Sequence, residues 1–98
     1  MAAKTLYRDE NRIFAELLRD LRREAKLTQV EISQRLSRAQ TFASEAERGL
    51  RKLDVVQVRD WCQVCGVALV DVVAEFERRL KDPAYKEPRE PDARRRGG

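Results

Sequence analysis

The segment over residues 36–49, "LSRAQTFASEAERG", constrains the fold most strongly. It predicts a turn followed by a short helix from Ala39 to Arg48, after which Gly49 suits a left-handed C-terminal cap. Phe42 is the one bulky apolar side chain in this helix, and its neighbours are small or polar. A helix that buries only one thin edge adds little to a core, so its opposite side is available to a partner.

A second short helix precedes this turn. The motif "TQVE" is a capping box, in which the Thr28 hydroxyl accepts from the Glu31 amide and the Glu31 carboxylate reaches back. Ile32 and Leu36 are spaced to face inward, and Ser33 between them is small enough for another helix to approach closely. We therefore expect two short helices joined by a tight turn.

Helical spacing and capping residues predict three more helices. Apolar residues recur at helical spacing in the first of them, and Asp54 is expected to cap the fourth helix, which stops at Gly66. The β-branched valines support strands only weakly, because the caps and spacing around them favour helices. We expect an all-α fold with five helices, the additional three over residues 9–25, 55–65 and 69–80.

The chain is expected to form one folded domain, since 98 residues suit a single core. The segment after Leu80 contains all three prolines. Its composition cannot bury enough apolar surface to offset the entropy cost of ordering the chain. The predicted organisation is a polar arm over residues 1–8, a domain over residues 9–80 and a disordered tail over residues 81–98.

Composition disfavours catalysis and membrane association. The chain has no histidine, which removes the usual general base near neutral pH and the commonest metal ligand. We therefore expect no enzymatic activity, no cofactor and no metal ion. No apolar run approaches the roughly 18 residues of a membrane span, and the first residues do not form a secretory signal. The expected location is the cytoplasm.

The motif "CQVC" invites a redox or metal interpretation, which the rest of the sequence does not favour. Zinc would need further ligands, and Cys62 and Cys65 lie near a predicted helix C-terminus, where the helix dipole opposes a thiolate. We expect both cysteines to be core thiols. Trp61 on the same helix is expected to pack in the core or at the helix edge rather than to mark a ligand pocket.

The polar face of the short helix carries side chains that recognise base edges. Glutamine pairs with adenine, threonine and serine meet several bases, and glutamate accepts from the cytosine amino group. Such a helix, preceded by another whose N-terminal amides favour a phosphate, is typical of a helix-turn-helix that enters the major groove. The net charge of +4 permits nucleic-acid binding and also fits an ordinary solvated surface. The side chains concerned are Gln40, Thr41, Ser44 and Glu45, with Thr28 and Gln29 on the preceding helix.

The text "LRREAKLTQVEISQRLSRAQTFASEAERG", followed by "LDVVQVRDWCQVCGVALVDVV", resembles the Cro and phage-repressor-like helix-turn-helix family, also called the xenobiotic-response-element family. The clearest landmarks are "LTQ", "ERG" and "CGV", and the resemblance covers residues 21–80 without a gap. It implies a lambda-repressor-like DNA-binding domain and a sequence-specific transcriptional regulator that binds double-stranded DNA. Family repressors commonly form homodimers, so a homodimeric repressor is expected.

The resemblance also implies roles for individual residues. It places the four polar side chains of the short helix at base-reading positions, and it gives Gln29 a frequent contact with that helix. Arg22 and Glu47 occupy the places of a buried, structural ion pair. An Arg51→Ala substitution is then expected to weaken binding to all sequences alike. The implied phosphate contacts are Thr28, Gln29, Arg38, Arg48, Arg51 and Lys52.

The sequence departs from the family at several positions. Ala43 and Ala46 stand where larger side chains are usual, so this helix is expected to lie closer to the core or to pack loosely. Ser37 replaces the usual turn glycine. Glu45 stands where lysine, arginine or glutamine is frequent, and it either specifies a base or weakens binding to the phosphates.

Two further questions stay open at the level of sequence. Phe76 and Leu80 either complete the core or form a dimer seam. The alternative function is a protein-interaction or antitoxin-like module that keeps the fold, binds DNA weakly or not at all, and acts on a partner protein. Glu45 and the modest net charge support this alternative.

Overall fold

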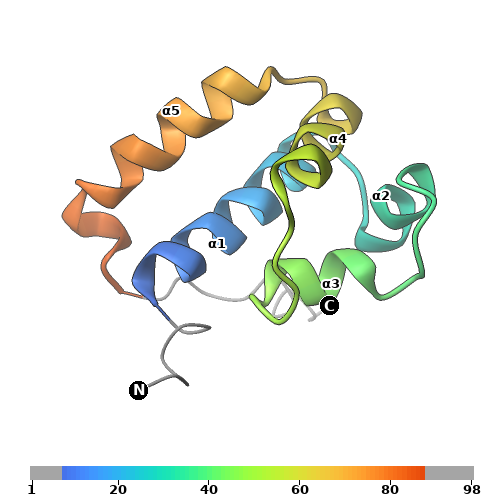
Figure 1. Cartoon of the computed structure of the whole chain (residues 1–98), viewed down its shortest axis with the longest axis horizontal. Helices are drawn as coiled ribbons and strands as arrows, with labels where there is room; N and C mark the ends of the chain where they lie inside the picture. Colours follow the sequence, from blue (N-terminus) through green and yellow to red (C-terminus); the bar gives the residue numbers. More distant parts are fainter. Residues whose placement is uncertain (1–7, 88–98) are drawn as a thin grey trace.

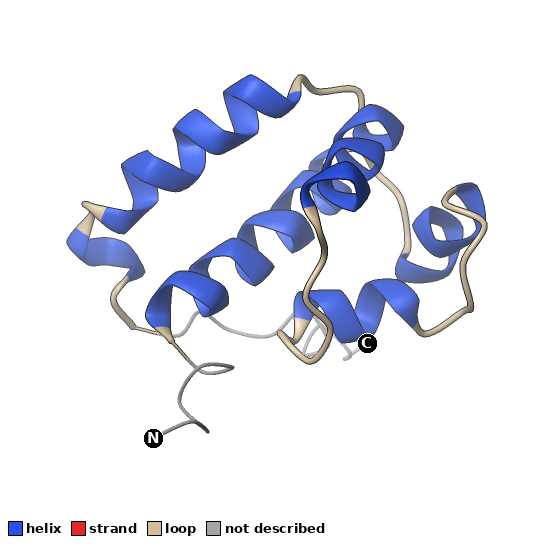
Figure 2. Cartoon of the chain, viewed as in Figure 1, coloured by secondary structure: helices blue, strands red, loops and turns tan. Residues whose placement is uncertain are grey.

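The computed structural model describes residues 8–87 of the chain. Five α-helices and one short 3-10 helix make up its regular structure, and the described residues contain no strand (Figure 2). The expected all-α fold with five helices is therefore confirmed. The elements are α1 (Asp9–Glu24), α2 (Gln29–Arg35), α3 (Phe42–Glu47), α4 (Val55–Cys65), α5 (Leu69–Leu80) and η2 (Pro83–Tyr85).

Helix α1 runs through the middle of the molecule, between α5 on one side and α2 and α3 on the other (Figure 1). Its adjacent residues Leu17 and Leu18 are both fully buried and belong to different apolar clusters. Complete burial of a leucine contributes about 1.5–3 kcal/mol, so α1 anchors both sides. Leu18 packs with Ile32, Phe42, Ala43, Ala46 and Trp61, and Leu17 packs with Val58, Cys62 and Val72.

The capping residues set the ends of three helices. The Thr28 hydroxyl accepts from the Glu31 amide at 3.0 Å, and the Glu31 carboxylate accepts from the Thr28 amide at 2.8 Å. Asp54 and Gln57 make the same reciprocal pair at the start of α4, at 2.8 and 2.9 Å. Two glycines adopt the left-handed conformation that ends a helix, Gly49 after α3 with φ 76° and Gly66 after α4 with φ 78°.

The turn between α2 and α3 is longer than expected, because α3 begins at Phe42 rather than at Ala39. The Phe42 amide donates to the Ala39 carbonyl at 3.0 Å, which is a tighter turn than an α-helix makes. Ser33 on α2 supplies the missing cap, since its buried hydroxyl accepts from the Ala43 amide at 3.0 Å. Ser37 adopts the left-handed conformation with φ 58°, a conformation that glycine takes at lower cost.

Small side chains attach α3 to the rest of the molecule. Ala43 and Ala46 are both buried against α1 and α2. A cavity of about 120 Å³ remains beside Ala46, between α1 and the loop that follows α3. The helix therefore lies close to the core along one edge and leaves space at the other. The apolar lining of this cavity is Phe14, Ala15, Leu18, Ala46 and Leu53.

The segment after α5 differs from the expected disordered tail. Residues 81–87 form a turn and η2, which packs against α5. The guanidinium of Arg79 lies over the Tyr85 ring at 4.7 Å, and Arg12 Nη2 donates to the Tyr85 carbonyl at 2.8 Å. Arg12 also donates to the carbonyls of Lys86 and Glu87, at 3.0 and 3.3 Å. These contacts offset the ordering entropy that composition alone left uncompensated. The remaining tail, residues 88–98, and residues 1–7 of the arm lie outside the described residues.

Charged side chains connect α5 to α1. The buried Arg79 donates to Asp20 at 2.9 Å and to Glu75 at 2.7 Å. Arg78 also donates to both carboxylate oxygens of Glu75, at 2.9 and 2.8 Å. Hydrogen bonds from Arg78 and Arg79 lower the pKa of Glu75 to about 2. Glu75 therefore stays ionised at any pH at which the protein is expected to work.

Candidate nucleic-acid interface

Gln40 and Thr41 lie in the turn before α3, and both side chains are exposed. Ser44 and Glu45 follow in the first turns of α3 and are half-buried. Helix α3 forms one outer edge of the molecule, with α2 beside it and α5 on the far side of α1 (Figure 1). The four residues predicted to recognise bases thus share one surface, but two of them come from a turn rather than from a helix.

Glu45 is paired within the protein. Arg51 Nε donates to Glu45 Oε1 at 3.1 Å, and Arg51 Nη2 lies 3.0 Å from the same oxygen. The Arg51 amide also donates to the Glu45 carbonyl at 3.3 Å. Arg51, predicted as a phosphate contact, is therefore attached to a residue predicted to recognise a base.

Phe42 supports two of the predicted phosphate contacts. The guanidinium of Arg38 lies 5.1 Å from the centre of its ring, and that of Arg51 lies 5.4 Å from it. Phe42 itself is buried, and its ring centre is 6.5 Å from that of Trp61. Cation–π contacts of this kind restrict the position of an arginine head group. In the sequence Phe42 is notable only as the one bulky apolar side chain of its helix; the spacing of four residues between Arg38 and Phe42 was the available signal for the cation–π contact.

Arg22 and Glu47 form a buried, two-pronged ion pair between α1 and α3. Arg22 Nε donates to Glu47 Oε2 at 2.6 Å, and Arg22 Nη2 donates to Oε1 at 3.0 Å. Arg22 Nη1 donates to the Leu27 carbonyl at 2.9 Å. Gln29 Nε2 on α2 donates to Glu47 Oε1 at 2.9 Å. One carboxylate therefore connects three helices, and this network sets the angle at which α3 meets the core.

The N-terminus of α2 has fewer free hydrogen-bond donors for a phosphate than the sequence predicted. The amide and hydroxyl of Thr28 are both engaged with Glu31, whose carboxylate lies at this helix N-terminus. A carboxylate at this position competes with a phosphate for the helix dipole. The phosphate-contacting role of Thr28 remains a prediction with reduced structural support.

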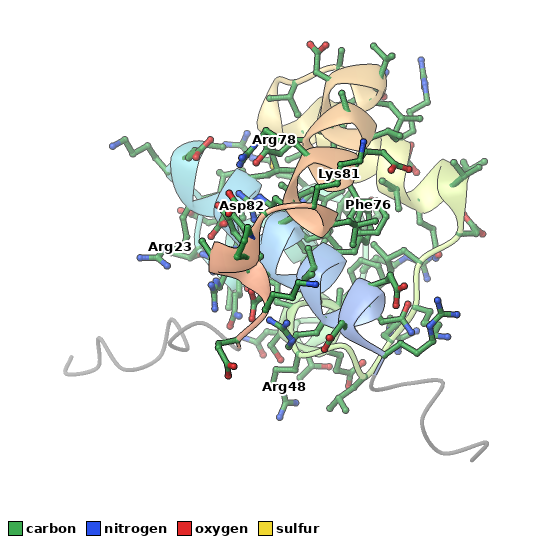
Figure 3. All side chains as sticks on the ribbon, turned by 90° about the vertical axis from the view of Figure 1, so that its left-hand side faces the viewer. Arg23, Arg48, Phe76, Arg78, Lys81 and Asp82 are labelled. Carbon is green, nitrogen blue, oxygen red and sulfur yellow. The ribbon has the colours of Figure 1, made fainter. Side chains whose placement is uncertain are left out.

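The loop after α3 carries two further exposed cations of this surface. Arg48 and Lys52 are both exposed, and Arg48 Nε donates to the Ser44 carbonyl at 3.4 Å. The Arg48 side chain points away from the helices at the edge of the molecule (Figure 3). These two residues can meet a phosphate backbone that passes beside α3.

The residues predicted for a dimer seam, Phe76 and Leu80, are partly buried within the domain itself. The rings of Phe76 and Phe14 pack edge to face, with centres 5.1 Å apart, and both Phe76 and Leu80 are only half-buried. The apolar side chains that α5 exposes most are Val70, which is 73% exposed, and Val73, which is 45% exposed. Helical spacing predicts that Val73 shares one apolar stripe with Val72 and Phe76, but the structure leaves Val73 exposed beside that stripe. Val70 was not singled out from the sequence.

The cysteines show the features of core thiols. Cys62 is fully buried, and both cysteines are free. Burial raises the pKa of the Cys62 thiol. Burial, followed by the charge of Cys62, raises the pKa of Cys65 to about 11, so both remain unreactive thiols near neutral pH. Trp61 is fully buried too, and its Nε1 donates to the Leu18 carbonyl at 3.1 Å.

Residues 8–87 contain no group of three or more histidine, cysteine or acidic side chains arranged to hold a metal ion. Over the same residues, no helix combines the length and the apolar character that crossing a membrane requires.

The arrangement of these helices is shared with known proteins. The helix-turn-helix domain family matches residues 13–76. The crystal structure of the clp gene regulator ClgR from C. glutamicum is similar, with a TM-score of 0.63 and 22% sequence identity, covering 69% of this chain and 87% of that one. No curated protein sequence is significantly similar to the chain. The likeness to ClgR shows a common fold, and the family match covers more than half of the chain, so this protein belongs to the helix-turn-helix domain family.

Proposed function

We propose that the protein is a sequence-specific, double-stranded DNA-binding transcriptional regulator of the xenobiotic-response-element type. The observation that carries the proposal is the exposure of Gln40 and Thr41 at the start of a helix whose other edge is buried. Polar side chains at this place in a helix-turn-helix enter the major groove. The family match and the fold shared with a gene regulator support the same assignment.

Each part of the surface has a chemical role in this proposal. Gln40 and Thr41 contact base edges from the turn, and Ser44 and Glu45 do so from α3. Gln29 and the exposed cations contact phosphates, which contributes affinity for any duplex and makes binding depend on salt. The cations concerned are Arg38, Arg48, Arg51 and Lys52.

The same proposal includes a homodimeric repressor. Val70 and Val73 are exposed on α5, and α5 lies on the side of α1 remote from α3 (Figure 1), so a second copy that packs on α5 can leave the DNA surface open. A two-fold pair of such domains contacts half-sites about one helical turn apart. A bound sequence that is palindromic, together with a dimeric mass by sedimentation, tests this part.

The alternative is an interaction module that keeps the fold and acts on a partner protein. One observation favours it, namely that the Glu45 carboxylate cancels part of the positive charge of Arg51 on the proposed DNA surface. A salt titration separates the two functions. A DNA-binding protein loses affinity steeply as salt rises, whereas the alternative predicts no measurable duplex binding even at low salt.

The decisive experiment is selection of bound duplexes from a random pool, followed by binding measurements on the selected sequence. Gln40→Ala is expected to relax preference at one base step, at a cost of about 1–3 kcal/mol in discrimination. The matched control is Gln34→Ala, which removes the same exposed amide from α2 outside the proposed reading surface. Equal binding of the parent and Gln40→Ala to selected and random duplexes would refute base recognition by this surface.

A further inference from the structure

The negative charge of the half-buried Glu45 weakens DNA binding unless a positive charge compensates it. A carboxylate next to the phosphate backbone is repelled, and the repulsion falls when a cation is held beside it. The structure provides that cation, because Arg51 lies within 3.0 Å of Glu45 Oε1. The side chain of Glu45 is 33% exposed and that of Arg51 is 47% exposed, so both still reach solvent and a ligand.

Both contacts from Arg51 go to the same oxygen. Its Nε and Nη2 meet Glu45 Oε1, while Oε2 has no hydrogen bond to any residue that the structure describes. A carboxylate oxygen without a partner accepts from an amino group, and cytosine N4 is the base-edge donor that glutamate recognises in the major groove. Arg51 therefore occupies one side of the carboxylate and leaves the other available.

Arg51 is also held in place, which a screening cation alone would not require. Its amide donates to the Glu45 carbonyl at 3.3 Å, and its guanidinium lies 5.4 Å from the centre of the Phe42 ring. The adjacent cation, Lys52, makes no hydrogen bond or ion pair with residues 8–87. Two neighbouring cations of one loop thus differ in whether they are connected to α3.

From this difference we propose that Arg51 is a positioning residue for base recognition, which directs Glu45 toward a cytosine amino group. The proposal rests on the proposed DNA-binding function and goes beyond it, because it gives Glu45 a base and gives Arg51 a part in specificity. It replaces the expectation that Arg51 contributes equally to all sequences. It also answers the question left open for Glu45, which specifies a base because its charge is compensated.

The test compares Arg51→Ala with Lys52→Ala on a panel of duplexes. The panel holds the selected sequence and its three variants at each position. Both substitutions remove one positive charge from the same loop, so both are expected to weaken binding and to reduce the salt slope by about 0.9. Only Arg51→Ala is expected to lower the preference for cytosine at one position, by about fivefold or more.

Two further variants, Glu45→Gln alone and Glu45→Gln combined with Arg51→Ala, identify the base pair that Glu45 contacts. Glu45→Gln is expected to lose the cytosine preference at the same base pair, since a neutral amide favours adenine there. In the Glu45→Gln protein, the further change Arg51→Ala is expected to cost only what Lys52→Ala costs, because nothing is left for Arg51 to position. Thermal unfolding of each variant checks that these substitutions leave the fold intact.

The outcomes distinguish this inference from the proposed function. If the parent shows no preference among duplexes, the proposed function itself is wrong. If the parent is selective but Arg51→Ala keeps every preference as Lys52→Ala does, the protein is a sequence-specific binder and the positioning role of Arg51 is overturned. A change of preference at a position that Glu45→Gln does not affect would overturn it as well.

Discussion

The two sides of α1 are attached by different kinds of contact. On the α3 side, Phe42 is the one bulky apolar side chain that α3 buries, Ala43 and Ala46 are small, and directional polar contacts set the position of the helix. On the α5 side, larger apolar side chains such as Phe76 and Val72 fill the interface, with ion pairs at its edge. Apolar contact is non-directional, whereas hydrogen bonds specify an angle. The difference indicates that α3 is positioned for its angle and α5 for burial.

The largest effect is expected at the centre of the α3 network. Glu47→Ala removes the partner of the buried Arg22 and leaves an uncompensated charge, at a cost of about 3–5 kcal/mol in the free energy of unfolding. Urea denaturation measures this change. The matched control, Glu77→Ala on the exposed face of α5, is expected to stay within about 0.5 kcal/mol. A cost below about 1 kcal/mol for Glu47→Ala would show that the network does not hold α3.

A smaller effect is expected at the start of α3. Ser33→Ala leaves the buried Ala43 amide without its acceptor, which costs about 1–3 kcal/mol. Hydrogen exchange of that amide is expected to accelerate more than exchange in α5. Ser44→Ala removes a hydroxyl from α3 itself, where the side chain is half-buried and bonded at 3.4 Å, and serves as the control for stability. Equal stability of the two variants would contradict the capping role of Ser33.

The smallest effect concerns the ion pairs of α5. Hydrogen bonds from Arg78 and Arg79 lower the pKa of Glu75 to about 2, below the value near 4.3 of an unfolded chain. Because the folded state has the lower pKa, this stabilisation is present above about pH 4.3 and is lost as pH falls toward 2. Solvent screening of the partly exposed carboxylate keeps it below about 1 kcal/mol.

Glu75→Gln tests that pH dependence. Its free energy of unfolding, followed by urea denaturation between pH 2 and pH 6, is expected to fall less steeply with acid than that of the parent. Glu77→Gln changes an exposed carboxylate of the same helix and is expected to leave the slope unchanged. Parallel profiles for the parent and Glu75→Gln would show that this network adds nothing to the stability of the α5 side.

Local patterns predicted the helices well where capping chemistry is strong. The motif "TQVE", Asp54 and the two left-handed glycines lie where the structure begins or ends a helix, because these signals act over three or four residues. The start of α3 was predicted less well. Its cap comes from Ser33 on another helix, and no signal within residues 39–42 shows that contact.

The sequence indicated which residues belong to the candidate site, and the structure adds how their side chains are paired. Gln40, Thr41, Ser44 and Glu45 were predicted from the sequence to recognise bases, and this stays a prediction; in the structure Gln40 and Thr41 are exposed and Ser44 and Glu45 are half-buried. An arginine that compensates Glu45 was conceivable from the sequence, but that Arg51 is this arginine was not predicted, because the contact depends on how the loop returns past Gly49. The order of residues 81–87 was missed for a similar reason, since Arg12 lies at the other end of the sequence.

For this protein the sequence alone determined the five helices, their approximate limits and the polar composition of the surface beside α3. These properties depend on periodicity and on capping groups a few residues apart, which are local in the chain. Only the tertiary structure decided that Arg51 pairs with Glu45 and that the segment after α5 is held against α1. Such contacts join residues distant in sequence, and folding alone brings those residues within hydrogen-bonding distance.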